Sequence, residues 1–458
     1  MVNKILLTIL LINSISNYSQ CWKSVSVGDT HQMAIALNGT LWGWGFNANG
    51  NLGDGTNTFK TSPVQIGSET DWKMVSSGGS HNLAIKNDGS LWAWGYNAYG
   101  AIGDGTTINK NYPVQIGSDF DWRVAKCGFY FSIAIKNNGT IWTWGNNNHG
   151  QLGYGDSNIG TSNPNVLVPT QIGASTNWSD ISAGYDFVIA LKTSGTLWAW
   201  GFNDFGQLGD GSTLWRFTPV QIGIQNTWQS ISTGSMHSMA IKNNGTLWTW
   251  GYNLNAQLED NTTVNKYIPT QISTSTNWQM VSAGYLHSMA LKSDGTMWGW
   301  GPNINGSLGD GTTTSKLVPT QIGTNTNWKS IHSGQYFTSG IKQDNTLFSW
   351  GKNLSGQLGI GTMTNVSTPT QVVCSSLSEV DFTDKSKISI DPNPSKGTIN
   401  IRIEKNIDKI IIINILGKEV FESIDGLKQI DISNLKQGIY FIRIQSQGKT
   451  FIQKIIKE

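Results

Sequence analysis

Four histidines recur at one position of a repeated sequence and are the first candidates for metal binding. They are His31, His81, His237 and His287, and the matching position of three further copies holds Phe131, Phe187 and Phe337. Equivalent positions in successive repeats lie apart in space, whereas a zinc site needs its ligands close around one ion. Phenylalanine at the same position also indicates an apolar slot. We therefore interpret the histidines as packing residues and expect no metal site.

Aspartates between two glycines form a second recurring pattern, at Asp54, Asp104, Asp210 and Asp310. Carboxylates in such an array suggest calcium binding or acid–base catalysis. Tight turns select the same two residue types. Three other copies depart from the pattern, with Tyr154, Glu259-Asp260 and Ile360. We therefore favour turn chemistry. The sequence has no nucleophile elbow, phosphate loop or His-Glu helix motif, so it predicts no catalytic residue, no cofactor and no enzyme.

The chain has three cysteines, Cys21, Cys127 and Cys374. An odd number leaves at least one of them without an intrachain partner. Cys127 stands where other copies of the repeat have serine, and we expect it to be a buried thiol. Cys21 precedes the first copy and Cys374 follows the last, so closing the repeats into a ring would bring them together. This predicts a Cys21–Cys374 disulfide; two free thiols, or removal of the Cys21 region by processing, are the alternatives.

A unit of some fifty residues occurs seven times and must position all of these side chains. Each copy begins with a tryptophan, and successive copies start 50, 50, 56, 50, 50 and 50 residues apart, at Trp22, Trp72, Trp122, Trp178, Trp228, Trp278 and Trp328. In copy two, "WKMVSSG", "HNLAIK", "LWAWG" and "PVQI" read as four short strands. Asp88-Gly89 between the second and third strands predicts a two-residue type I′ hairpin turn.

Four short antiparallel strands per copy, repeated seven times, predict a seven-bladed β-propeller over residues 21–374. Residues two apart on a strand share a face, so paired tryptophans such as Trp42 and Trp44 lie side by side. Such pairs are suited to filling the wedge-shaped gaps between blades. The alternative, an aromatic platform for sugars, is less favoured for them.

The repeated pattern "SxGxxHxxAI…DGxLWxWGxNxxGQLGDG…PxQI" resembles that of the regulator-of-chromosome-condensation family, over residues 22–373. This resemblance implies a seven-bladed propeller. Members of the family include nucleotide-exchange factors for a small GTPase on chromatin, photoreceptors, propellers attached to ubiquitin ligases and secreted β-lactamase inhibitors. The fold carries over without any of these activities. An exchange-factor role conflicts with the targeting signal described below.

Recognition is expected where the copies differ. Trp215 is the only tryptophan outside the repeat pattern, in "GSTLWRFTP". Trp215, Arg216 and Phe217 together have the composition of a binding hot spot. Copy three lengthens the same loop, which places both loops on one rim of neighbouring blades. We expect this rim to bind an extracellular protein or a glycan; packing of Trp215 against its own blade is the alternative.

The N-terminal segment indicates export. Lys4, an apolar run from Ile5 to Ile12 and small polar residues after it are typical of a signal peptide, here residues 1–20, because the run is too short to span a bilayer. A lipoprotein signal ending at Cys21 is the less favoured alternative. No other segment is long and apolar enough to cross a membrane. The chain holds 31 Lys and Arg against 29 Asp and Glu. Since they form no basic patch, we expect no nucleic-acid partner.

The C-terminal segment follows a polar linker at residues 375–386. Alternating apolar positions in "TINIRI", "IYFIRI" and "TFIQKII" predict a small β-sandwich over residues 387–458. The segment resembles the C-terminal sorting domain of cargo for the type IX secretion system of Bacteroidetes. The matching residues are Pro392, Asn393, Pro394, Gly417, Lys418, Gly438, Tyr440 and Lys454. The resemblance implies handling by that secretion machinery and a destination at the cell surface or outside the cell.

Together these features predict an all-β chain, a seven-bladed propeller followed by a small sandwich. The leading functional hypothesis is a secreted or surface-displayed, non-catalytic scaffold that binds another macromolecule. An extracellular enzyme acting on glycans would need a pair of carboxylates on one rim, which the residues that break the repeat do not offer. A purely architectural surface protein is the third possibility, and it predicts no ligand.

Overall fold

A computed structural model describes residues 21–155, 165–373, 388–403, 406–414, 419–424, 427–446 and 449–458. The chain divides into two compact units, residues 1–374 and 375–458. The described residues of the first unit form seven four-stranded antiparallel sheets in a ring, as the sequence predicts. The signal-peptide assignment falls on residues outside the described ranges.

Each sheet is one blade, built from four strands in chain order. Blade one contains β1 (Trp22–Val27), β2 (His31–Ala36), β3 (Leu41–Gly45) and β4 (Lys60–Ile66). Blade two contains β5 (Trp72–Ser77), β6 (His81–Lys86), β7 (Leu91–Gly95) and β8 (Lys110–Gln115). Blade three contains β9 (Trp122–Cys127), β10 (Phe131–Lys136), β11 (Ile141–Gly145) and β12 (Val166–Gln171). Blade four contains β13 (Trp178–Ala183), β14 (Phe187–Lys192), β15 (Leu197–Gly201) and β16 (Arg216–Gln221).

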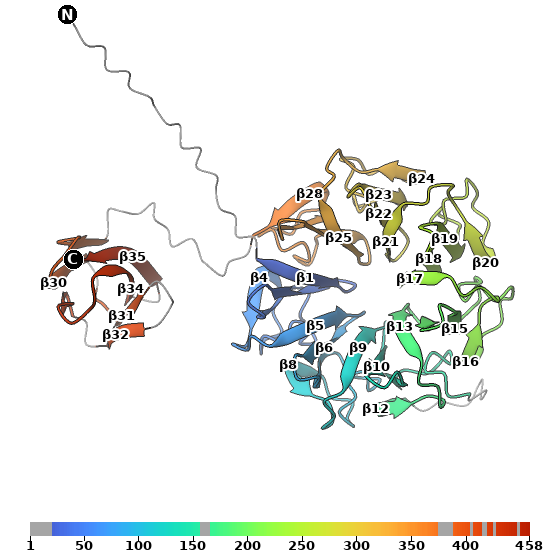
Figure 1. Ribbon diagram of the computed structural model, residues 1–458, viewed down its shortest axis with the longest axis horizontal. Helices are drawn as coiled ribbons and strands as arrows, with labels where there is room; N and C mark the ends of the chain where they lie inside the picture. The colour runs from blue at the N-terminus through green and yellow to red at the C-terminus, as the bar shows by residue number, and fades with distance from the viewer. Residues whose placement is uncertain are drawn as a thin grey trace, which may run out of the picture. The chain divides into compact units, whose positions relative to one another are not determined.

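The remaining three blades repeat this order. Blade five contains β17 (Trp228–Thr233), β18 (His237–Lys242), β19 (Leu247–Gly251) and β20 (Lys266–Gln271). Blade six contains β21 (Trp278–Ala283), β22 (Ser288–Lys292), β23 (Met297–Gly301) and β24 (Lys316–Gln321). Blade seven contains β25 (Trp328–Ser333), β26 (Phe337–Lys342), β27 (Leu347–Gly351) and β28 (Val366–Val372). Figure 1 shows the first strand of every blade nearest the central axis and the fourth at the outer edge.

The hairpin turn between the second and third strands differs from the predicted two-residue type. In blade one the amide of Gly39 donates to the carbonyl of Ala36, and the amide of Ala36 donates to Thr40. The loop therefore has three residues, and its last residue, Gly39, has a φ of 81°. A type I turn followed by one residue with positive φ needs glycine only at that final position. Asn38 has another role, since its Oδ1 accepts hydrogen bonds from the amide and hydroxyl of Thr40.

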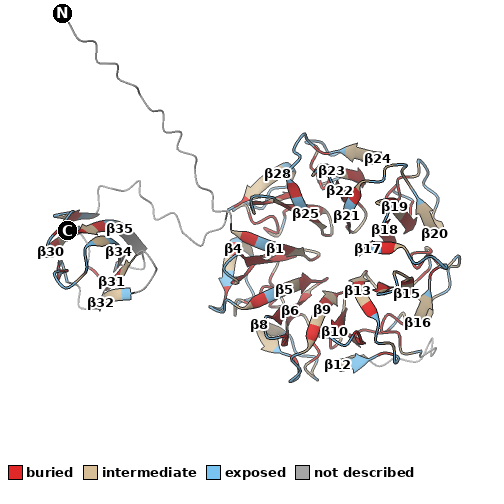
Figure 2. Ribbon diagram, in the orientation of Figure 1, coloured by how far each residue is buried: buried red, intermediate tan, exposed pale blue. Residues whose placement is uncertain are grey.

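The tryptophan pairs of the third strands join neighbouring blades, as the sequence predicts, mainly through their second member. These second members are fully buried, and the indole of Trp94, for example, donates to the carbonyl of Asn51 in blade one at 3.1 Å. Five equivalents do the same across other seams: Trp44, Trp144, Trp200, Trp300 and Trp350. The first member is less buried, and Trp92 donates within its own blade to Ser90. The core thus lies between the blades, as in the cluster that joins Leu83 and Leu91 of blade two to Trp122 and Trp144 of blade three. Figure 2 shows the outer strands of the blades mainly as intermediate or exposed.

Seven glycines surround the central axis, each directly after the first strand of its blade. They are Gly28, Gly78, Gly128, Gly184, Gly234, Gly284 and Gly334. A Cβ on Gly234 would lie 2.3 Å from the carbonyl oxygen of Gly284 in the next blade. Real Cβ atoms do not approach an oxygen so closely, so this position accepts only glycine without displacement of the backbone.

Backbone and side-chain hydrogen bonds both join blade seven to blade one: the amide of Trp22 donates to the carbonyl of Asn345 at 3.2 Å, and the amide of Gly361 donates to the carbonyl of Thr61 at 2.8 Å. No strand is exchanged, because β25 to β28 all come from one copy. Gln32 donates to the carbonyl of Gln357 at 2.6 Å and accepts from the hydroxyl of Ser339 at 2.7 Å. Cys21 is half-buried and packs beside Trp22 in this seam. Cys374 lies outside the described residues, so the Cys21–Cys374 disulfide stays a prediction.

The second unit consists of two sheets around an isoleucine-rich core. One sheet has the order β29 (Ile388–Asp391), β30 (Thr398–Ile403) and β33 (Gln429–Asp431). The other has the order β32 (Glu419–Ser423), β31 (Lys409–Asn414), β34 (Gly438–Ser446) and β35 (Lys449–Lys457). Ile399 and Ile430 from the first sheet share one buried cluster with Ile410 and Ile442 from the second. Two sheets enclosing one apolar layer are the predicted sandwich.

Several sorting-domain residues have a defined structural role. Asn393 pairs with the last strand, because its Nδ2 donates to the carbonyl of Lys454 at 2.7 Å and its Oδ1 accepts from the amide of Ile456 at 2.8 Å. Pro392 and Pro394 flank it, each after a cis peptide bond. Tyr440 is buried and its hydroxyl donates to the carbonyl of Lys436. Gly438 begins β34. Gly417 and Lys418 lie outside the described residues.

Candidate functional site

The four recurrent histidines are buried links between blades. The Nε2 of His237 lies 2.9 Å from the hydroxyl of Ser288 in the next blade, and Ser288 in turn donates to the carbonyl of Gln257. His31, His81 and His287 make the equivalent contacts to Asn82, Ser132 and Thr338. Burial lowers the pKa of His237 to about 3, so its imidazole is neutral. Among the described residues no group of three His, Cys, Asp or Glu side chains is placed to hold a metal ion.

The residue facing this slot in the next blade is polar opposite every histidine, but it is not always apolar opposite phenylalanine. Phe131 faces the same position of the next blade as a histidine does, and there the partner is Val188 instead of a polar residue. Phe187 is opposite Ser238, whose hydroxyl is satisfied by the carbonyl of Gln207 at 2.8 Å. The slot therefore tolerates either ring, provided the neighbouring polar group keeps a partner.

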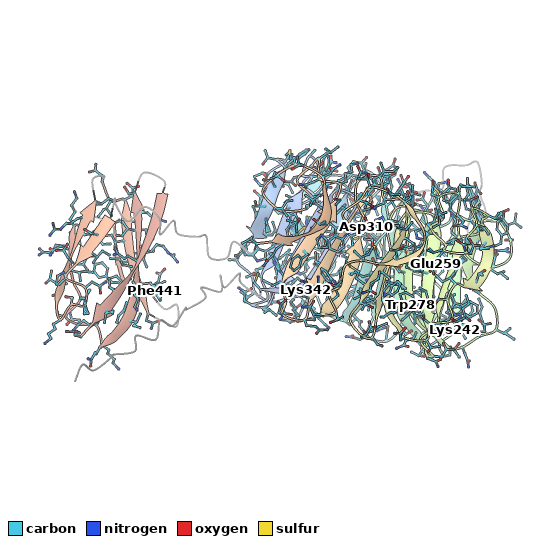
Figure 3. The ribbon with its side chains drawn as sticks, turned by 90° about the horizontal axis from the view of Figure 1, so that it is seen from above. Lys242, Glu259, Trp278, Asp310, Lys342 and Phe441 are labelled. Atoms are coloured by element: carbon cyan, nitrogen blue, oxygen red, sulfur yellow. The ribbon has the colours of Figure 1, made fainter. Side chains whose placement is uncertain are left out.

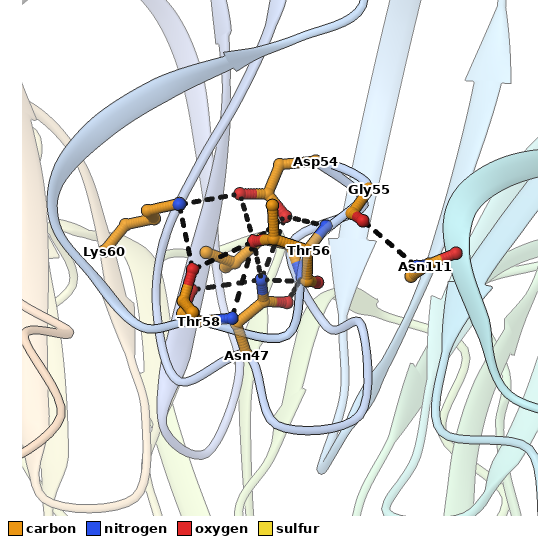
Figure 4. Close-up of polar contacts among 8 residues, drawn as sticks. Asn47, Asp54, Gly55, Thr56, Thr58, Lys60 and Asn111 are labelled. Atoms are coloured by element: carbon orange, nitrogen blue, oxygen red, sulfur yellow. Dashed lines mark hydrogen bonds and ion pairs between the residues drawn. The ribbon is translucent and has the colours of Figure 1, made fainter.

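The aspartates at the loop after the third strand organise turns and pair with a cation (Figure 4). Asp54 accepts hydrogen bonds from the amide and hydroxyl of Thr56 and from Asn47. Its Oδ2 lies 3.2 Å from the Nζ of Lys60 at the start of β4. Partial burial opposes the charge of Asp54, but these hydrogen bonds lower its pKa below the usual value.

The same ion pair occurs in four further blades: Asp104–Lys110, Asp210–Arg216, Asp260–Lys266 and Asp310–Lys316. Asp260 thus belongs to the set, although Glu259 replaces the glycine that precedes the aspartate in the Gly-Asp-Gly pattern. In copies three and seven, Tyr154 and Ile360 take the place of the aspartate. The turn interpretation accounts for all five carboxylates.

Of the three residues of the predicted hot spot, two follow the repeat. Arg216 occupies the position of Lys60, and its guanidinium lies 2.5 Å from Asp210. Phe217 packs against Gly150 of blade three, where a Cβ would lie 2.5 Å from its Cδ1. Blade two packs Asn111 against Gly50 at the equivalent place. Arg216 and Phe217 therefore contribute to packing at repeat positions, whereas Trp215 stands where other copies have Asn or Ser and copy one has Phe59.

Trp215 joins an aromatic cluster at the loops that follow the third strands. Its ring centroid lies 4.8 Å from that of His149 and 5.6 Å from that of Phe202, and its indole donates to Asp204 at 2.7 Å. Phe205 extends the cluster, 6.1 Å from Phe202 and 5.0 Å from Tyr252 of blade five. Trp215 is half-buried.

A second cluster occupies the same end of the neighbouring blades. Phe129 stacks on Tyr185 with centroids 3.8 Å apart and also contacts Tyr130 at 4.1 Å. Tyr130 in turn contacts Tyr96 and Tyr99. All five rings are half-buried. We call the two clusters together the aromatic face: Tyr96, Tyr99, Phe129, Tyr130, His149, Tyr185, Phe202, Phe205, Trp215 and Tyr252.

Asp186 lies between the two clusters. Its Oδ2 is 3.1 Å from Nδ1 of His149, and Gln151 donates to its Oδ1 at 2.9 Å. Its charge also contributes to the raised pKa of Tyr185, although burial of that phenol is the larger cause. The repeat pattern does not reveal this grouping, because the two positions after each of the seven glycines around the axis vary between copies, for example Gly79-Ser80, Phe129-Tyr130 and Tyr185-Asp186.

Asp29 stands apart at the mouth of the central channel. It lines a cavity of about 110 Å³ together with Phe129, Tyr185, Ser235 and Tyr285. Burial raises the pKa of Asp29 to about 7, and the positive charge of Lys352 opposes that rise. Cys127 lines the same cavity and is a buried free thiol, as expected. In the described part of the chain no helix is long and apolar enough to span a membrane.

Comparison with known families accounts for both units. A model described as the RCC1-like domain matches residues 127–393, more than half of the chain. Regulator of chromosome condensation repeats match residues 38–85 and 88–135, and a further repeat model matches residues 73–101. A secretion system C-terminal sorting domain matches residues 389–458. No curated protein matches the sequence.

Solved propellers share the fold at low sequence identity. Human WBSCR16 is 20% identical with a TM-score of 0.67, over 73% of this chain and 94% of that chain. Prp20p of Saccharomyces cerevisiae, described with its binding to Gsp1p and histones, is 20% identical with a TM-score of 0.64, over 83% of this chain and 92% of that chain. At such identities the likeness establishes the architecture of the ring and leaves its ligand open.

Proposed function

This chain belongs to the RCC1-like domain family and ends in a secretion-system sorting domain, and on that premise we propose that it is an exported, non-catalytic propeller that binds another macromolecule through its aromatic face. The sorting domain supports handling by type IX secretion machinery and delivery to the cell surface or beyond. An extracellular protein or glycan is the partner, in place of a GTPase or nucleic acid.

The observation that carries this proposal is the grouping of half-buried aromatic rings from blades two to five at one end of the ring. Rings that keep part of their surface in water while their edges are fixed by neighbours offer contact area at small cost in conformational entropy. Trp215 is the strongest candidate, because four other copies hold at its position an asparagine or serine that caps the backbone: Asn109, Asn265, Ser315 and Asn365.

The carboxylates of the aromatic face support binding over catalysis. Asp186 is engaged by His149 and Gln151, and Asp204 accepts from the indole of Trp215. A glycosidase needs one protonated and one ionised carboxyl group flanking the scissile bond. Fixed acceptors that hold aromatic rings in place serve recognition better than proton transfer.

The test measures how fluorescently labelled protein, residues 21–458, binds to the cells that export it and to their extracted surface polysaccharide. We expect saturable binding that falls at least ten-fold in a double variant, Phe205→Ala with Trp215→Ala. Ile268→Ala provides the matched control, since Ile268 is an exposed apolar residue on the outer strand β20, with 60% of its surface accessible.

The arms of the experiment separate the alternatives. Loss of binding after protease treatment of the cells identifies a protein partner, whereas binding to the extracted polysaccharide identifies a glycan. Equal binding by the parent and the double variant would exclude the aromatic face. Absence of any saturable binding would favour an architectural role and overturn the proposal.

A further inference from the structure

Lysines recur at the end of the second strand in six blades and lie over aromatic rings. They are Lys86, Lys136, Lys192, Lys242, Lys292 and Lys342. Each Nζ lies over two rings, between 3.6 and 5.2 Å from their centroids. The rings belong to the first and third strands of the same blade, as Trp178 and Trp198 do for Lys192. Such cation–π contacts stabilise an ammonium group but do not neutralise it.

Blades two and three neutralise this lysine with acids from the preceding linker. The Nζ of Lys86 is 2.6 Å from Glu69 and 3.5 Å from Asp71. Lys136 is paired in the same way with Asp119 at 2.5 Å and Asp121 at 3.1 Å. Burial opposes the charge of Lys136, but its hydrogen bonds to these two acids outweigh burial and raise its pKa.

Blades four to seven lack acids at these two linker positions, and in blade four the lysine also lines a cavity. Ser175 and Asn177 stand where blade three has Asp119 and Asp121. The Nζ of Lys192 donates to the hydroxyl of Ser175 at 3.3 Å, and no carboxylate of the described residues forms an ion pair with it. Partial burial lowers the pKa of Lys192, as expected for a cation without a counter-ion.

A cavity opens beside Lys192 at the seam between blades three and four. Its volume is about 490 Å³, within the range of small-molecule sites. Lys192, Trp178, Trp198, Gln171, Ser175 and Thr218 line it, together with Gly153. Tyr154 also lines it, so the cavity combines one cation, apolar indole surface and four polar side chains.

The seam between blades five and six shows that a carboxyl group is accommodated at the equivalent place. Glu259 replaces the glycine that corresponds to Gly153, with a φ of 70°. Its side chain is buried and lies within electrostatic range of Lys292, whose charge opposes the rise in pKa that burial causes at Glu259. Figure 3 labels Glu259, with Trp278 of the same seam. Burial raises the pKa of Glu259 to about 9, so this carboxyl group is protonated at pH 7, and among the described residues only blades two and three supply an ionised acid at this lysine.

We propose that the cavity between blades three and four binds a carboxylate-bearing ligand of the size of one acidic monosaccharide, with the carboxylate on Lys192. The missing linker acids leave the ammonium group of Lys192 available to an external anion. Gln171, Ser175 and Thr218 are suited to the hydroxyl groups of a sugar ring, and the indole of Trp198 to its apolar face. This site is separate from the aromatic face.

The experiment titrates the chain, residues 21–458, with glucuronate, acetate and glucose by calorimetry at pH 7 in chloride-free buffer. We expect glucuronate to bind more tightly than acetate, and glucose not to bind. Lys192→Met keeps the aliphatic stem over the rings but removes the charge, and it should weaken glucuronate binding at least ten-fold. Lys86→Met is the matched control and should leave binding unchanged, since Lys86 is already paired.

A second variant distinguishes the loss of ligand binding from misfolding. Ser175→Asp places a carboxylate where Asp119 pairs with Lys136, so it should abolish glucuronate binding without lowering the melting temperature. Glucuronate binding that is unchanged in both Lys192→Met and Ser175→Asp would overturn the proposal. Equal binding of glucose and glucuronate, or no binding of glucuronate at about 50 mM, at the weak end of ligand affinities, would overturn it as well.

Discussion

Replacing His237 with phenylalanine should remove a defined part of the acid sensitivity of the propeller. Burial lowers the pKa of this imidazole from 6.5 to about 3. Its contribution to stability is therefore complete above pH 6.5 and is lost as the pH falls from 6.5 toward 3, because the unfolded chain takes up the proton first. For one such group the loss is about 2 kcal/mol at pH 5 and below about 0.1 kcal/mol at pH 7.5.

The structure contains a template for this substitution. Phe187 occupies the equivalent slot, and the hydroxyl of Ser238 opposite it still donates to a backbone carbonyl. In His237→Phe the hydroxyl of Ser288 keeps its own bond of 2.9 Å to Gln257. We therefore expect the variant to fold, at a constant cost for the lost hydrogen bond.

The assay is urea unfolding followed by tryptophan fluorescence at fixed ionic strength from pH 7.5 to pH 5. The difference in unfolding free energy, variant minus parent, should move by about 2 kcal/mol in favour of the variant over this range. A reciprocal control, Phe187→His, should move in the opposite direction. Parallel pH profiles for parent and variant would refute a neutral, buried His237 in the folded chain.

Four further outcomes follow from the same contacts. Trp200→Ala should cost about 3–5 kcal/mol of unfolding free energy, and Trp198→Ala clearly less, because only Trp200 is fully buried between blades; urea titration of both variants checks the order. Gly234→Ala should lower the melting temperature through its clash with the next blade, measured by calorimetry. Cys127, whose pKa burial raises to about 12, should resist iodoacetamide at pH 8 until the chain unfolds, as mass spectrometry would show. Asn393→Ala removes two hydrogen bonds to the last strand and should destabilise the sorting domain by about 1–3 kcal/mol, measured by its own unfolding transition and by the amount of exported protein.

Much of the ring could be predicted because each blade is encoded locally. The recurring tryptophans and the Asn-Gly turns specify one blade, and copies of one blade can pack only against each other. The pattern also predicted that His31 and its equivalents are packing residues. It did not show that Arg216 is the ion-pair partner of Asp210. The other four blades with this ion pair have lysine at the same position, so Arg216 looks like a departure from the repeat although it keeps the ion pair.

The groups proposed to bind ligands were harder to find for a physical reason. Tyr130 and Tyr96 contact each other across two blades, although 34 residues separate them. The open Lys192 became visible only by comparison with Lys136 and its acids, which belong to the preceding linker rather than to the strand. The proposed functions depend on residues that differ between copies. The consensus pattern of the repeat does not contain these residues.

The seam between blades seven and one has a consequence for how such a chain can be rearranged. All four strands of each sheet come from a single copy of the repeat. Blades seven and one therefore share no strand and are joined by contacts such as the hydrogen bond from Ser339 to Gln32. A circularly permuted gene that begins at blade two, with blade seven joined to blade one by a short linker, should therefore yield the same seven-bladed propeller. Duplication or loss of a whole copy between ancestral genes would equally leave each remaining sheet intact.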